Sequence, residues 1–138
     1  MQPRKTIPPF YILAISQNRV RLFSCDEREA REVPQVALKI PKSVVEEVGS
    51  VEHGPERENT KLRIEEFFRL VDRGLLKALK NGREPLLLAA VDFLVPLYRR
   101  ANTYPHLFES HVPGNPDRMT ARDLHGKAMG ILRSPHSA

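Results

Sequence analysis

Cysteine is nearly absent from this chain, in which Cys25 is the only one among 138 residues. A single cysteine excludes a disulfide framework within the chain and a zinc site built from several thiolates. Because the residues before it alternate in the manner of a strand, we expect Cys25 to lie on a strand as a small apolar side chain.

Long apolar runs are missing as well. No stretch approaches the ~20 consecutive apolar residues that a membrane-spanning helix requires. The opening residues, MQPRKTIPPF, lack the uninterrupted apolar core of a signal peptide. We therefore expect a cytoplasmic protein without membrane association, and we interpret residues 1–9 as a lead-in or linker.

The common signatures of catalysis are also not found. There is no glycine-rich phosphate loop, and no serine or cysteine nucleophile stands beside a recognisable base partner. Of the five histidines, His106 and His111 fall in one predicted strand at a separation that points them to opposite faces. We expect solvated or structural histidines, with neither a metal site nor a cofactor.

Charge, by contrast, is plentiful, with 22 lysines and arginines against 17 aspartates and glutamates and a formal net charge of +5. This surplus is compatible with an acidic partner such as RNA. The basic residues are nevertheless scattered among acidic ones, so the simpler interpretation is a solvated surface of mixed charge.

The first part of the chain has the pattern of a β-meander. Residues 10–15 (FYILAI) are apolar on both faces, which indicates an interior strand, and residues 19–25 alternate. The Gln17–Asn18 turn between them predicts an antiparallel hairpin. A third strand is predicted over residues 31–38, where Pro34 indicates an edge or a bulge.

Helical patterns follow the meander. A short helix is predicted over residues 43–48, and residues 50–59 (SVEHGPEREN) predict an exposed loop. Asn59 or Thr60 then caps a long helix that runs to about Lys80, because apolar residues recur at helical spacing.

The stretch over residues 84–101 (EPLLLAAVDFLVPLYRRA) combines a buried strand at residues 86–90 with a helix. Asp92 lies two residues after the end of the strand, at the carboxyl end where α/β proteins often bind ligands. Metal chemistry there would also need an acid on the first strand, which has none. We therefore interpret Asp92 as the N-cap of the helix.

A last strand is predicted over residues 104–112 and a final helix after the cap Thr120, while residues 134–138 form a tail. The order of elements predicts one α/β domain over residues 10–133. Its architecture is expected to be a mixed sheet with flanking helices.

Four segments of this sequence resemble the bacterial archaeo-eukaryotic release factor family, over nearly the whole chain. They are FYILAISQNRVRLF (residues 10–23), FFRLVDRGL (67–75), PLLLAAVDFLVPLYRRANTYPHL (85–107) and HVPGNPDRMTARDLHGKA (111–128). The resemblance is to the middle domain of the class-one peptide-chain release factor type, and it implies a ribonuclease H-like mixed sheet.

Members of that family usually place another domain before this one and an L7Ae-like domain after it. Neither is present in these 138 residues. The resemblance therefore implies a fragment of a longer protein, a truncated product or one subunit of a split protein. In the last case a protein partner would supply the flanking domains.

The loop that carries the family's chemistry departs from the expected pattern. In the release factor a Gly-Gly-Gln loop between the third strand and the long helix enters the peptidyl-transferase centre. The corresponding residues 50–59 contain one glycine, Gly54, and no glutamine, since the three glutamines are Gln2, Gln17 and Gln35. Peptidyl-tRNA hydrolysis is therefore not carried over.

The leading hypothesis is a non-catalytic, release-factor-like module that binds the ribosome or tRNA in translation quality control or rescue. Its expected nucleic-acid contacts are His53, Gly54, Arg57 and Lys61, in and beside the exposed loop. The alternative is a protein-interaction or scaffolding domain with no role in binding nucleic acid. A hydrolase is disfavoured because no acid pair, metal cluster or nucleophile can be assembled.

Overall fold

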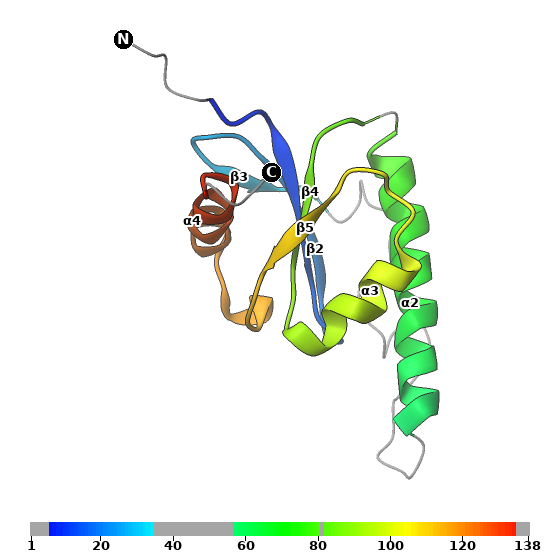
Figure 1. Ribbon diagram of the computed structural model, residues 1–138. Helices are drawn as coiled ribbons and strands as arrows, with labels where there is room; N and C mark the ends of the chain where they lie inside the picture. The colour runs from blue at the N-terminus through cyan, green and yellow to red at the C-terminus, as the bar shows by residue number, and fades with distance from the viewer. Residues whose placement is uncertain (1–5, 35–56, 81, 135–138) are drawn as a thin grey trace.

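The computed structural model of the protein describes residues 6–34, 57–80 and 82–134. One five-stranded sheet forms the centre of the molecule, with α2 and α3 on one side and α4 on the other (Figure 1). In chain order the elements are β1 (Phe10–Ile15), β2 (Val20–Cys25), β3 (Ala30–Glu32), α2 (Arg57–Ala78), β4 (Leu86–Ala89), the 3-10 turn η2 (Asp92–Leu94), α3 (Val95–Ala101), β5 (Leu107–Val112), the 3-10 turn η3 (Pro116–Arg118) and α4 (Ala121–Leu132).

The sheet is mixed, with the strand order β3-β2-β1-β4-β5. β2 is antiparallel to both of its neighbours, whereas β1, β4 and β5 run parallel. β1 and β4 are interior strands and every residue of β4 is buried, as their apolar sequences predict. The α/β class and the mixed sheet with flanking helices are thus confirmed, and the arrangement agrees with a ribonuclease H-like sheet.

The edge strand β3 is shorter than the sequence predicts. It covers Ala30–Glu32, starting one residue earlier than expected and ending before Pro34. Proline has no N–H to donate to a neighbouring strand, which explains why the pairing stops there. The last residues of the predicted strand, 35–38, lie outside the described residues, as does the predicted short helix at 43–48.

Helix α2 begins earlier than predicted. Its first residue is Arg57, so the predicted caps Asn59 and Thr60 lie inside the helix and both interpretations are wrong. Arginine and glutamate are strong helix formers, and an acidic residue such as Glu58 is favoured in the first turn. Local propensity therefore extends the helix into the predicted loop.

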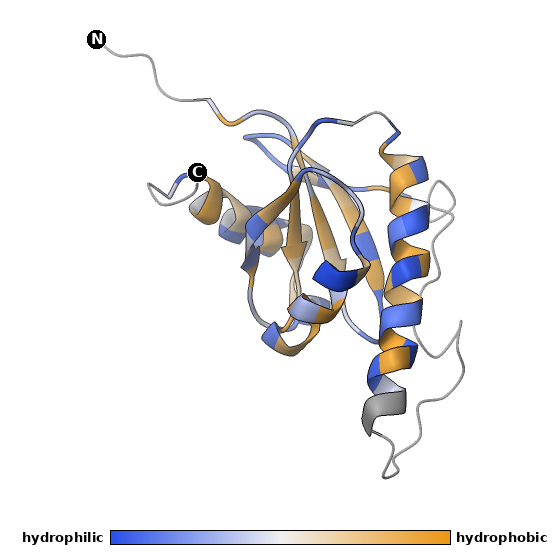
Figure 2. Cartoon of the chain, turned by 45° about the vertical axis from the view of Figure 1, so that its right-hand side comes forward, coloured by the Kyte–Doolittle hydropathy of each residue, from blue (hydrophilic) through white to orange (hydrophobic). Residues whose placement is uncertain are grey.

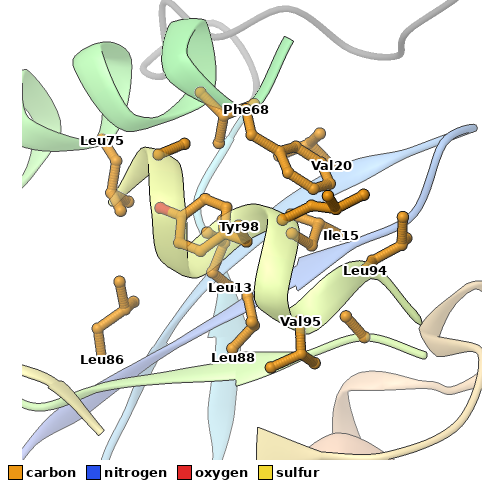
Figure 3. Packing of buried hydrophobic residues seen from close by; sticks show 14 of the residues in the cluster. Leu13, Ile15, Val20, Phe68, Leu75, Leu86, Leu88, Leu94, Val95 and Tyr98 are labelled. Atoms are coloured by element: carbon orange, nitrogen blue, oxygen red, sulfur yellow. The ribbon is translucent and has the colours of Figure 1, made fainter. Parts of the chain in front are cut away.

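Each face of the sheet has its own apolar core, because neighbouring residues of a strand point to opposite sides. Figure 2 shows the hydrophobic residues gathered on the strands and on the inner sides of the helices. Against α2 and α3, strand residues such as Leu13, Ile15 and Leu88 pack around the buried Tyr98 (Figure 3). Against α4, the core contains Phe10, Ile12, Phe23, Cys25, Leu124 and Ala128.

Cys25 lies at the end of β2 as a buried apolar side chain, as predicted. Burial, reinforced by the nearby charge of Asp26, raises the pKa of its thiol to about 12. A thiol with that pKa carries almost no thiolate at neutral pH, so Cys25 is a packing residue rather than a nucleophile.

In the described part of the chain, no helix has the length and apolar character needed to cross a membrane.

Helix α4 begins as the sequence predicts. The Thr120 hydroxyl accepts a hydrogen bond from the backbone N–H of Asp123 at 3.1 Å, and the Asp123 carboxylate accepts one from the N–H of Thr120 at 3.0 Å. This reciprocal pair is a capping box. It sets the direction in which α4 crosses the second face of the sheet.

A buried arginine ties the β1–β2 hairpin to the segment before α4. Arg21 is only 5% exposed, and its guanidinium donates to the backbone carbonyls of Pro116 and Met119, the latter at 3.2 Å. Beside it, the Ser16 hydroxyl donates to the Asp117 carboxylate at 2.7 Å. These contacts join residues about a hundred positions apart and hold the hairpin turn against η3.

Replacing Arg21 by methionine keeps most of the apolar stem but leaves both carbonyls without their donor. Each unsatisfied group costs about 1–3 kcal/mol when water is excluded, so we expect Arg21→Met to lower the free energy of unfolding by ~2–4 kcal/mol. Urea unfolding followed by circular dichroism measures this. Arg19→Met, at an exposed position of the same hairpin, is the control and should stay within ~0.5 kcal/mol of wild type. If both variants lose the same free energy of unfolding, the stabilising role assigned to the Arg21 hydrogen bonds is wrong.

Candidate nucleic-acid interface

The structure places only part of the predicted contact site. His53 and Gly54 lie outside the described residues. Arg57 is the first residue of α2 rather than part of a loop, which corrects the prediction for that position. Lys61 is exposed one turn further along the same helix. The two basic residues are therefore carried by a helix, not presented by a flexible connection.

Beyond Lys61, the solvent side of α2 carries a row of basic residues that are not among the predicted contacts. One side of the helix is buried against the sheet through Ile64, Phe68, Val71 and other apolar residues. The opposite side exposes Arg69, Arg73, Lys77 and Lys80, the last of them just after the helix. These four residues are called the basic face below.

One exposed acid, Glu66, stands three residues before Arg69 on the same side of α2, and from Arg69 onward the basic face has no exposed acid beside it. Between residues 67 and 83 the only carboxylate is Asp72, which is 3% exposed and turned inward. It accepts hydrogen bonds from the backbone N–H of Thr103 at 2.9 Å and from the Thr103 hydroxyl at 2.6 Å. Glu65, one turn before Arg69, is paired with Arg100 of α3 at 3.1 Å. Both acids are thus used to fasten α2 to the chain around α3.

The spacing of the basic face is unfavourable for the helix itself. Arg69, Arg73 and Lys77 are four residues apart, about 6 Å along the helix axis. Like charges at this spacing destabilise a helix by about 0.2–0.5 kcal/mol per pair. Within the described residues, the structure records no side-chain hydrogen bond or ion pair for any residue of the basic face. The basic face therefore makes no evident contribution to the stability of the fold. Its positive charge is suited to binding a polyanion.

The bases of α4, on the other side of the sheet, are arranged differently. Arg122 and Lys127 are exposed, but the carboxylate of Asp123 lies between them in the sequence. Two hydrogen bonds from Thr120 are the main cause that lowers the pKa of Asp123, with smaller contributions from Lys127 and Arg122. The charge of α4 is therefore mixed, whereas Arg69, Arg73 and Lys77 follow one another without an exposed acid between them.

Asp92 does not cap a helix, contrary to the prediction. Val91 occupies the N-cap position of η2, and Asp92 is the first residue of that turn with no side-chain cap hydrogen bond. Its Oδ1 atom instead lies 2.9 Å from Nε2 of His111, on the neighbouring strand β5. Pairing between the strands continues past β4, since the N–H of Ala90 donates to Val112 at 3.1 Å, and this brings the two side chains together.

The Asp92–His111 pair does not by itself make a catalytic or metal centre. A nucleophile activated by such a pair would have to lie within hydrogen-bond reach of the histidine. The polar contact recorded for the His111 ring is the one with Asp92, whose carboxylate is 83% exposed. Across residues 6–34, 57–80 and 82–134, no group of three or more His, Cys, Asp or Glu side chains is placed to hold a metal ion.

Comparison with known families supports the resemblance of the sequence. Residues 9–137 match the family described as "Bacterial archaeo-eukaryotic release factor family 3". The match covers nearly the whole chain, including β1 through α4. Among curated proteins, none matches the chain.

If the basic face serves binding rather than folding, neutralising it should not harm stability. We expect the triple variant Arg69→Gln, Arg73→Gln, Lys77→Gln to be as stable as wild type or up to ~1 kcal/mol more stable, because two repulsive pairs are relieved. Urea unfolding at low and high salt measures this, and the difference should shrink as salt screens the charges. A loss above ~1 kcal/mol would show that these side chains support the fold.

Proposed function

The chain belongs to bacterial archaeo-eukaryotic release factor family 3, and from this membership we propose that it is a non-catalytic module that binds the RNA of the translation machinery. The RNA is ribosomal or transfer RNA, and the biological setting is translation quality control or rescue. The family relationship supports the link to translation, while the binding activity is argued from the surface of α2.

The basic face is the observation that carries the proposal. From Arg69 to Lys77 it extends along about 12 Å of helix, at 1.5 Å per residue, and Lys80 follows just after the helix. Its side chains stand on a helix whose inner side is packed against the sheet, so their stems are well positioned before binding. Lysine and arginine residues in such a row neutralise successive phosphates, which releases counterions and supplies affinity without reading sequence.

Two of the residues predicted from the loop, Arg57 and Lys61, stand on the same helix before the basic face. Lys61 is exposed on the same helix as the basic face. Arg57 begins that helix, and the contacts of His53, Gly54 and Arg57 with RNA remain predictions. Arg57 and Lys61 precede the basic face along α2, and we expect RNA that continues toward the start of the helix to reach them.

The module is proposed as non-catalytic because of the composition of residues 50–59. This segment has the single glycine Gly54 and no glutamine, so the Gly-Gly-Gln sequence of the release factor is not present. The Asp92–His111 pair, the other arrangement with chemical potential, has no activated nucleophile recorded beside it. Binding is therefore the activity that the described side chains support best.

The triple variant Arg69→Gln, Arg73→Gln, Lys77→Gln tests the proposal directly. We expect it to bind tRNA or ribosomes roughly tenfold or more weakly than wild type near physiological salt. The slope of log K against log salt concentration should become shallower by about 2, at about 0.7 per lost single-strand phosphate contact. Filter binding with labelled tRNA and ribosome co-sedimentation over a salt series measure both quantities.

A matched control lies on the opposite side of the sheet. The variant Arg122→Gln, Lys127→Gln, Arg133→Gln also removes three positive charges, from α4 and from the residue after it. It should retain the wild-type salt slope, because its bases lie away from the proposed contact. If the two triple variants weaken binding equally, net charge rather than the basic face is responsible.

One observation favours the alternative function, a protein-interaction domain. Leu62 and Leu76 are 57% and 38% exposed on α2, and helical spacing places both near the basic face. Apolar side chains beside basic ones suit an acidic protein surface as well as RNA. A discrete protein partner that remains bound after nuclease treatment, together with no binding to tRNA or ribosomes, would favour this alternative.

A further inference from the structure

Three parallel strands end at one edge of the sheet. β1, β4 and β5 all run toward this edge, drawn at the bottom of Figure 1, where the β1–β2 turn, η2 and η3 lie close together. We call it the carboxyl edge and define it by residues 17–19, 91–93 and 113–118. Ligands of α/β proteins commonly bind outside the carboxyl ends of parallel strands.

Phe93 is the unusual residue of the carboxyl edge. Its side chain is 53% exposed, although Leu94 next to it is 2% exposed and fixed in the core. The turn that carries Phe93 is ordered by a hydrogen bond from the N–H of Leu94 to the carbonyl of Val91 at 3.0 Å. Of the large hydrophobic side chains exposed in the described part of the chain, it is the only aromatic one. The fold thus presents an aromatic ring on a rigid support.

The carboxyl edge also carries exposed polar groups that can accept or donate hydrogen bonds. Asp92 precedes it, with one carboxylate oxygen held by His111 at 2.9 Å and 83% of the side chain exposed. Arg19 and Arg118 are exposed on the neighbouring turns of the same edge. A purely apolar partner would bury these charges without compensation, whereas a nucleotide offers a ring to stack, donors for a carboxylate and a phosphate for an arginine.

We propose that the carboxyl edge binds an unpaired RNA base, which stacks on Phe93. The Asp92 carboxylate accepts a hydrogen bond from an amino or imino group of the base, and His111 holds that carboxylate in position. Arg19 and Arg118 contact the adjoining phosphates. The proposal rests on the proposed function in one respect, that the nucleic acid bound by this chain is RNA.

The edge is held in shape before any ligand arrives. Arg21 binds the carbonyls of Pro116 and Met119, and Ser16 binds Asp117 at 2.7 Å, so the hairpin turn and η3 are fixed against each other. η2 is fixed separately by the burial of Leu94. A preformed site does not lose affinity to the ordering of its own loops.

The absence of tryptophan from the chain makes the proposal directly testable. The variant Phe93→Trp has a single tryptophan, and a base stacked on it should quench its fluorescence. We expect a saturable loss of fluorescence with a single-stranded RNA octamer, and none with a duplex of the same sequence, whose bases are already stacked. Lys127→Trp, at an exposed position on α4, is the matched control and should respond to neither through stacking.

Removal of the ring gives the second readout. Phe93→Ala should bind the octamer about tenfold more weakly, which is the loss of affinity expected when one base–aromatic stack is removed. Its thermal unfolding should be nearly unchanged, because the side chain is half exposed. If the wild type binds the octamer but Phe93→Ala binds it equally well and Phe93→Trp is not quenched, this inference is wrong while the proposed function stands. If the wild type binds neither tRNA, ribosomes nor the octamer, the proposed function fails as well.

Discussion

The burial of β1 and β4 on both faces is the constraint on which this architecture depends. Two interior strands that are apolar on both sides require a helix on each side of the sheet. α2 and α3 cover one face and α4 covers the other, and each helix must then turn its remaining surface to solvent. The exposed side of α2 is therefore a consequence of the core. The row of bases from Arg69 to Lys80, with no exposed acid among them, is not, and this is why we assign that row to binding.

Much of the fold follows from local pattern, and the deviations have physical causes. The apolar sequences of β1 and β4 and the Thr120 cap are visible in the sequence because each depends on neighbouring residues. Asp92 was misassigned because its partner, His111, lies on another strand and is brought near only by the sheet. The early start of α2 shows helix propensity prevailing over a loop-like composition at Arg57.

The site was harder to predict than the fold. Arg69, Arg73 and Lys77 recur every four residues, so their shared side of the helix can be inferred from spacing alone. What cannot be inferred is that Asp72 points inward to Thr103 and that Glu65 is occupied by Arg100, since both partners come from distant parts of the chain. Without those contacts, Asp72 and Glu65 would count as acids that balance the row. The same holds for Phe93, whose exposure depends on how η2 leaves the sheet.

The central claim is that RNA binds along the outer side of α2, and chemical-shift mapping tests it most directly. Titration of isotopically labelled protein with tRNA fragments should shift the resonances of Arg69, Arg73, Lys77 and Lys80, while those of Arg122 and Lys127 on α4 remain unchanged. Shifts of similar size on α2 and α4, or shifts confined to α4, would contradict the account.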